Sequence, residues 1–218
     1  MSRSTASAGR LALPLVLTFS AASIPVTALG VAMLVYLPPF MASHLHVSLA
    51  VVGGAWATVR FLDVGVDPLL GLAMDATRSP IGRYRPWMLA GAPILMLSVW
   101  SLFLAPPGIS GVYIVGWLFM LYLGTSIVGL AQSAWGARLA VDYHDRSRLF
   151  GALAASGVLG ALAILVIPIL ARQFGQSDAD AVRAMGWFVL LTTPAAIALV
   201  AVRTPEPVVK DHAHAAHF

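Results

Sequence analysis

Residues 60–87 read RFLDVGVDPLLGLAMDATRSPIGRYRPW, which places three charged side chains inside an otherwise apolar segment. Arg60, Asp63 and Asp67 are spaced i, i+3 and i+7, so in a helix they share one face. Charges inside a bilayer are costly, and they face other helices or a water-filled cavity. Pro68 also leaves a backbone carbonyl one turn earlier without its helical donor. The stretch therefore predicts a membrane helix with a polar, functional face.

Composition places the rest of the chain in the membrane as well. Hydrophobic residues make up 59% of the 218 residues, charged residues make up 10%, and the mean hydropathy is +0.86. These values are not those of a water-soluble domain. A bilayer core requires about 20 helical residues. We therefore predict an all-α integral membrane bundle over residues 11–203, between a cytoplasmic N-terminal segment (1–10) and a disordered cytoplasmic tail (204–218), with spans at 11–38, 47–75, 85–105, 111–139, 149–172 and 183–202.

The orientation of these spans follows from the distribution of the basic residues. Of the 13 Lys and Arg residues, all but Arg60, Arg172 and Arg183 fall on the side of the predicted spans that holds both termini. The positive-inside rule then predicts that both termini are cytoplasmic. No cleaved signal peptide is expected, because the first apolar stretch is too long for one.

Several classes of function are not expected. The chain has no cysteine, which excludes disulfides, thiolate metal sites and a cysteine nucleophile. Its basic residues are spread among the apolar segments and do not cluster with aromatic residues on one surface, so nucleic acid is not an expected partner. No nucleophile–base pair or metal cluster falls in a predicted membrane cavity, so neither an enzyme nor a cofactor is expected. His212, His214 and His217 leave weak metal binding as an alternative to a solvated tail.

Residues 60–87 resemble the glycoside-pentoside-hexuronide:cation symporters, the melibiose-permease branch of the major facilitator superfamily. The resemblance covers most of residues 11–205. It implies cation-coupled symport of a small polar solute, such as a sugar or glycoside, by alternating access in the bacterial cytoplasmic (inner) membrane. Further stretches that carry it are residues 36–40 (YLPPF), 91–93 (GAP), 134–137 (AWGA) and 142–148 (DYHDRSR).

The resemblance also implies a coupling-ion site. In this family Asp63 and Asp67 would coordinate the cation, H⁺ or Na⁺, with Arg60 in the same polar network. The Asn and Thr that assist Na⁺ in the family fall at Val66 and Gly129, which favours H⁺. The alternative from the residues alone is a buried ion pair that only fixes helix packing.

The segment between the second and third spans resembles the superfamily's cytoplasmic gating motif. Asp75 lies near the C-terminal end of its span, where the negative end of the helix dipole repels its charge. It therefore needs partners from elsewhere. The resemblance supplies these as neighbouring Arg residues and a helix from another half of the transporter. The alternative is that the Arg residues only set topology. The residues implied are Asp75, Arg78, Gly82, Arg83 and Arg85.

The substrate residues depart from the family pattern. Charged sugar-binding positions of the family fall at Thr27, Gln132 and Ala152, which carry no charge. Thr27, Gln132 and Trp135 are therefore expected to hydrogen-bond to, and stack on, a neutral polar substrate. Arg138 stands where many relatives carry Glu, and the sequence assigns it no role.

Family members have twelve spans in two six-helix halves, and this chain corresponds to the N-terminal half, built from two three-helix repeats. A lone half would turn Asp63 and Asp67 towards lipid, which is costly. A second six-helix half is therefore an expected partner, either another copy of this chain or a separately encoded one. The alternatives are a non-transporting membrane scaffold or accessory subunit, and a truncated transporter fragment.

Overall fold

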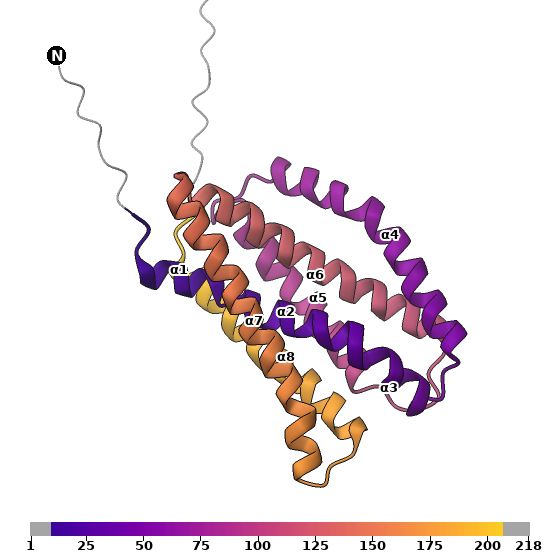
Figure 1. The fold of residues 1–218 in the computed structure, drawn as a ribbon. Helices are drawn as coiled ribbons and strands as arrows, with labels where there is room; N and C mark the ends of the chain where they lie inside the picture. The colour runs from indigo at the N-terminus through magenta and orange to yellow at the C-terminus, as the bar shows by residue number, and fades with distance from the viewer. Residues whose placement is uncertain (1–9, 207–218) are drawn as a thin grey trace, which may run out of the picture.

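The computed structural model describes residues 10–206, and these form helices and connecting loops without strands. Six helical segments are long and apolar enough to cross a membrane, which confirms the predicted all-α, six-span architecture (Figure 1). The first span, Leu13–Ser43, consists of α1 (Leu13–Ser20), α2 (Ser23–Val31), a π-helical turn η1 (Ala32–Tyr36) and α3 (Leu37–Ser43). The other five are α4 (Leu49–Ala76), α5 (Arg85–Phe103), α6 (Gly111–Leu139), α7 (Tyr143–Gln173) and α8 (Asp178–Arg203).

The first span extends past its predicted end at residue 38. Pro38 and Pro39 were expected to break the helix, but Pro38 lies in the first turn of α3, directly after η1. Amide groups in the first turn of a helix have no intrahelical acceptor, so proline costs little there. The π-helical turn thus lets the chain restart a helix at Leu37 and continue to Ser43.

The last two spans begin earlier than predicted. Helix α7 starts at Tyr143 rather than 149, and α8 starts at Asp178 rather than 183. The charged stretch before each span was read as loop, yet it forms the first helical turns. In α8 the reason is a capping box, in which Ser177 accepts from the Asp180 amide and Asp180 accepts from the Ser177 amide. Acidic side chains also stabilise a helix N-terminus, because the positive end of the helix dipole attracts their negative charge.

The packing of the helices follows the two three-helix repeats. The main neighbours are α5 with α6, α2 with α7, α4 with α6, and α5 with α8. The first repeat consists of the span α1–α3 with α4 and α5, and the second consists of α6, α7 and α8, so α2 corresponds to α6, α4 to α7 and α5 to α8. The α2–α7 contact thus corresponds to α6–α4, and α5–α6 corresponds to α8–α2, a pair that is also in contact. Helix α4 consequently lies at the edge of the bundle and packs mainly on α6 (Figure 1).

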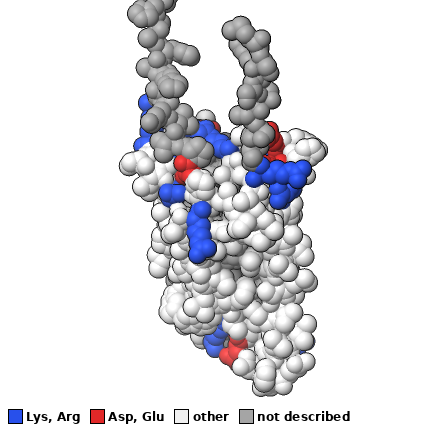
Figure 2. All heavy atoms as spheres, turned by 90° about the vertical axis from the view of Figure 1, so that its left-hand side faces the viewer, with Lys and Arg blue, Asp and Glu red and all other residues white. Residues whose placement is uncertain are grey.

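Charge and apolar surface are arranged as a membrane requires. On the face drawn in Figure 2, charged side chains gather near the two ends of the bundle, and the zone between them is largely uncharged. Large apolar side chains are exposed along the outer helices, such as Phe61 at 83% and Val64 at 72% on α4. The described part of the chain begins and ends at the same end of the bundle (Figure 1). The outer surface is thus suited to lipid, and the described chain starts and finishes on one side of the bundle.

Candidate functional site

Asp63 lies on α4 at the contact with α6, and both of its carboxylate oxygens have partners. Arg60 donates from Nη1 to Asp63 Oδ2 at 3.2 Å, and Ser126 of α6 donates from Oγ to Asp63 Oδ1 at 3.2 Å. Asp63 is only 7% exposed, whereas the Arg60 side chain is 71% exposed. The expectation that a lone half turns Asp63 towards lipid is therefore wrong, because α6 and Arg60 cover it.

Asp67 lies one turn further along α4, and its carboxylate has different surroundings from that of Asp63. Its Oδ1 atom is buried but accepts no hydrogen bond from any described residue. Among the described residues, Arg60 forms its ion pair with Asp63. The predicted three-residue network is therefore an ion pair and a separate carboxylate, that of Asp67. A charged carboxylate oxygen that lacks both water and donors is costly. Asp67 is thus the carboxylate of this site whose Oδ1 has no donor among the described residues.

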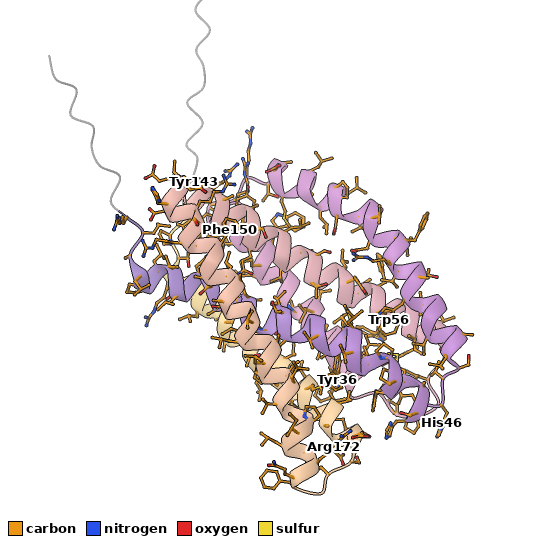
Figure 3. The ribbon with its side chains drawn as sticks, viewed as in Figure 1. Tyr36, His46, Trp56, Tyr143, Phe150 and Arg172 are labelled. Carbon is orange, nitrogen blue, oxygen red and sulfur yellow. The ribbon has the colours of Figure 1, made fainter. Side chains whose placement is uncertain are left out.

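The residues of α6 that complete this site were not predicted from the sequence. Ser126 bonds to Asp63, and Tyr122 lies within electrostatic reach of both Arg60 and Asp63. Their spacing of i, i+4 in an apolar span was the available signal, since it places two polar side chains on one helix face. Trp56, one turn before Arg60, adds a buried indole N–H with no partner among the described residues (Figure 3). The polar stripe of α4 is therefore longer than its charges indicate.

A pocket of about 480 Å³ opens between α2, α6 and α7. Thr27 and Gln132 both line it, so the structure brings these two predicted residues together. Gln132 donates from Nε2 to the Phe19 carbonyl and to Ser23 Oγ, each at 3.2 Å, which leaves its Oε1 as an acceptor. Ser23 and Ser133 also line the pocket, and none of the described residues around it is charged. The pocket is thus polar and neutral.

Helix α7 closes the other side of this pocket. Gly157 faces Thr27 so closely that a Cβ on Gly157 would lie 2.8 Å from Thr27 Oγ1. The Thr27 hydroxyl makes no hydrogen bond to another described residue, and it is therefore available to a ligand. Phe150, also on α7, adds an aromatic surface to the lining (Figure 3).

Trp135 does not belong to the pocket. Its ring is completely buried, packs edge-on against Phe19 at 5.6 Å between ring centroids, and lies 5.6 Å below the Arg85 guanidinium. The expectation that Trp135 stacks on a substrate does not fit this structure. The residue lies on the face of α6 that packs into the bundle core.

The α4–α5 loop (residues 77–84) holds most of the predicted gating residues. Arg83 Nη1 lies 3.7 Å from Asp75 Oδ1, an ion pair that gives Asp75 one of its expected Arg partners. Gly82 has a positive φ of 115°, a conformation that favours glycine. Arg78 lies exposed in the same loop, and Arg85 begins α5. The structure thus brings these residues together around one loop.

Two neighbours of this loop were not foreseen. The Arg138 guanidinium lies 5.3 Å from the centroid of the Tyr84 ring, a cation–π contact for a residue to which the sequence assigned no role. Glu206 accepts hydrogen bonds from the amides of residues 83–85. The tail was predicted to be disordered from residue 204, which is too early, because Thr204 is buried and Glu206 is bound. Residues 1–9 and 207–218, including the tail histidines, lie outside the described residues.

A six-span bundle with carboxylates buried at helix contacts and a neutral polar pocket between helices is an arrangement typical of membrane transport proteins. Residues 18–217 match the family described as MFS/sugar transport protein, and the chain belongs to that family. The resemblance noted in the sequence is thereby confirmed. Within residues 10–206, no group of three His, Cys, Asp or Glu residues is placed to hold a metal ion.

Individual relatives carry the names of transporters. The chain is 26% identical to a lactose permease of Lactobacillus helveticus over 185 residues, which cover 77% of this chain and 28% of the relative. It is 28% identical over 172 residues to an isoprimeverose transporter of Lactiplantibacillus pentosus, covering 76% and 35%. The inner membrane symporter YicJ of Escherichia coli is 37% identical over 59 residues, covering 27% and 13%. The chain thus spans about a third or less of the length of these relatives.

Proposed function

We propose that this chain is one six-helix half of a cation-coupled sugar symporter that works by alternating access. The observation that carries the proposal is the buried, unpartnered Oδ1 of Asp67, one turn from the neutralised Asp63. Carboxylates inside a membrane bundle mark ion pathways, because their cost is recovered when they bind an ion. The names of the relatives, which include lactose, isoprimeverose and symport, support sugar as the solute and a cation as the driving ion.

The coupling ion that fits this site best is H⁺, with Asp67 as its carrier. Hard cations take several oxygen ligands. Both oxygens of Asp63 already accept hydrogen bonds, from Arg60 and Ser126, and Val66 and Gly129 offer no side-chain oxygen. A proton needs only one carboxylate oxygen, and the free Oδ1 of Asp67 provides it. We therefore favour H⁺ over Na⁺.

The solute of this proposal is an uncharged sugar or glycoside held in the pocket between α2, α6 and α7. Gln132 Oε1 would accept from a sugar hydroxyl, and the hydroxyls of Thr27, Ser23 and Ser133 can donate or accept. Phe150 offers an apolar face to the sugar ring. A carboxylated sugar would lack a cation to pair with in this lining. The volume of about 480 Å³ lies within the usual range for small-molecule sites.

The working unit would be larger than this chain. The chain spans about a third of the length of these relatives, and we propose that a second six-helix half, within the same polypeptide, in another copy or in a separate chain, completes the cavity. That unit would lie in the bacterial inner membrane with both termini in the cytoplasm, as the charge distribution predicts. Native mass spectrometry in mild detergent would identify the partner, since a dimer and a complex with a second chain differ in mass.

The test of coupling is uptake in proteoliposomes, using radiolabelled lactose and isoprimeverose as the first probes. An imposed H⁺ gradient should drive accumulation by the unsubstituted protein. Asp67→Asn keeps the shape of the side chain but removes its capacity to carry a proton, so this variant should lose accumulation. Asp63→Asn should weaken it, because Arg60 and Ser126 lose their anionic partner.

The matched control is Asp178→Asn, which removes an exposed carboxylate at the opposite end of the bundle, where Asp178 pairs with Arg172 at 3.3 Å. This variant should accumulate sugar like the unsubstituted protein. Gradient-driven uptake that is unchanged in both Asp67→Asn and Asp63→Asn would refute the coupling site. A Na⁺ gradient that drives uptake where an H⁺ gradient does not would overturn the choice of ion.

A scaffold or accessory subunit remains the second candidate. The observation in its favour is that Trp135 is buried in the core and that the family's charged sugar positions are Thr27, Gln132 and Ala152 here. A stable complex with another membrane protein, with no solute flux from either component or from both together, would support this candidate. Flux that depends on Gln132 or Thr27 would exclude it.

A further inference from the structure

A carboxylate from the C-terminal end of the described chain caps the start of α5. Glu206 Oε1 accepts from the amides of Arg83 at 2.6 Å and Tyr84 at 2.7 Å, and Oε2 accepts from the amide of Arg85 at 3.1 Å. The first amides of a helix have no intrahelical acceptor, and the positive end of the helix dipole favours an anion there. Glu206 satisfies both requirements from more than 120 residues away in sequence.

Gly82 makes this contact possible. It adopts a φ of 115°, and a Cβ at this position would overlap the carboxylate of Glu206. Any other residue would therefore strain the backbone and displace the acidic side chain. The loop conformation and the position of Glu206 depend on each other.

The residues that precede Glu206 are held in place as well. Arg85 donates from Nη2 to the Thr204 carbonyl at 2.7 Å, and Trp135 donates from Nε1 to the Pro205 carbonyl at 3.4 Å. Thr204 is 1% exposed. Residues 204–206, here called the C-terminal strap, thus connect the end of α8 to α5 and α6.

The strap reaches α4 through the same loop. Helix α4 packs mainly on α6. Two side-chain pairs connect the end of α4 to the loop and the loop to α5. Arg83 pairs with Asp75 at 3.7 Å, and Trp87 donates from Nε1 to Thr77 Oγ1 at 2.9 Å. Because Glu206 binds the backbone of Arg83, it determines where the Arg83 side chain begins and hence whether it reaches Asp75.

We propose that Glu206 is a positioning residue for transport: it holds the α4–α5 loop where Arg83 pairs with Asp75, and so couples the end of α8 to the end of α4. Loss of its charge releases the loop and shifts α4 away from α5. The consequence for transport rests on the proposed function, because α4 carries Asp63 and Asp67. The rival role is that of a helix cap that only adds stability.

The absence of cysteine allows a direct distance measurement. Ala73 near the end of α4 and Val202 near the end of α8 are both exposed, and each can be replaced by Cys and spin-labelled. Double electron–electron resonance should give one narrow distance in the full chain. Glu206→Gln should broaden it or add a second, longer distance, whereas Asp178→Asn, which removes a carboxylate at the other end, should not.

A second readout separates positioning from capping. If Glu206 is only a cap, Glu206→Gln lowers the Tm but leaves the distance distribution and the maximal rate of gradient-driven uptake unchanged, which would overturn the proposal. If it positions the loop, the maximal rate changes severalfold while the KM for sugar stays the same, because the pocket is elsewhere. An unsubstituted protein without uptake would count against the proposed function alone, since the distance measurement needs no substrate.

Discussion

Replacing Gly157 with alanine should damage sugar binding without damaging the fold. The new Cβ would lie 2.8 Å from Thr27 Oγ1 and 3.5 Å from Thr27 Cβ. Contacts this short force something to move, and the Thr27 hydroxyl, which no described residue holds, is the group that can rotate away most easily. The substitution thus removes one hydrogen-bonding group from the neutral pocket.

The size of the effect follows from one lost hydrogen bond. A neutral hydrogen bond contributes about 0.5–1.5 kcal/mol, which corresponds to an increase in the KM for sugar of about 2- to 13-fold. Stability should not fall comparably, because alanine is favoured over glycine inside a helix by about 1 kcal/mol. The assay is initial-rate uptake in proteoliposomes at a fixed H⁺ gradient, with sugar concentration varied.

Two controls make this prediction strict. Gly151→Ala is the same change on the same helix with open space around the new Cβ, so its KM should be unchanged. Thr27→Val removes the hydroxyl directly, and combining it with Gly157→Ala should add nothing further, because both changes remove the same group. A KM for Gly157→Ala equal to that of Gly151→Ala, or additive effects in the double variant, would refute the proposed role of Thr27.

Three further substitutions, at Gly160, Trp135 and Ser177, should change the stability of the protein. Gly160→Ala should lower the Tm in detergent, since its Cβ would overlap the Ile24 backbone carbonyl and overpacking costs about 1–3 kcal/mol; a Tm at or above that of Gly151→Ala would contradict this. Trp135→Phe should lower the Tm through the lost Nε1–H bond but leave the KM for sugar unchanged, and a raised KM would return Trp135 to the pocket. Ser177→Ala should cost about 1 kcal/mol of helix stability, measured by thermal unfolding, because it removes the cap of α8.

The sequence predicted well those features that depend on one helix at a time. Hydropathy and length placed six spans, and the spacing of Arg60 and Asp63 by three residues predicted a pair that the structure contains at 3.2 Å. The position of Asp67, seven residues after Arg60 on the same helix face, did not show that it stands apart from that pair. Which carboxylate receives a second donor depends on Ser126 of α6, and periodicity within one helix carries no information about the neighbouring helix.

The features that the sequence missed arise between distant segments. Trp135 was expected to stack on a substrate because its motif resembles the family's, but its burial depends on how α6 packs against Phe19 and Arg85. The strap was missed because residues 204–218 were predicted to be a disordered tail. The partners of Glu206 are backbone amides around residue 84, and backbone amides have no signature in a sequence.

The cap on α5 has a consequence for biosynthesis. The amides of residues 83–85 leave the ribosome more than 120 residues before the side chain that binds them, so α5 enters the membrane with its start uncapped. The α4–α5 loop reaches its final conformation only after α8 has been inserted and Glu206 has been made. Shortening the chain before residue 206 should therefore disturb a loop completed much earlier in synthesis, whereas a tag added after it leaves this bond in place.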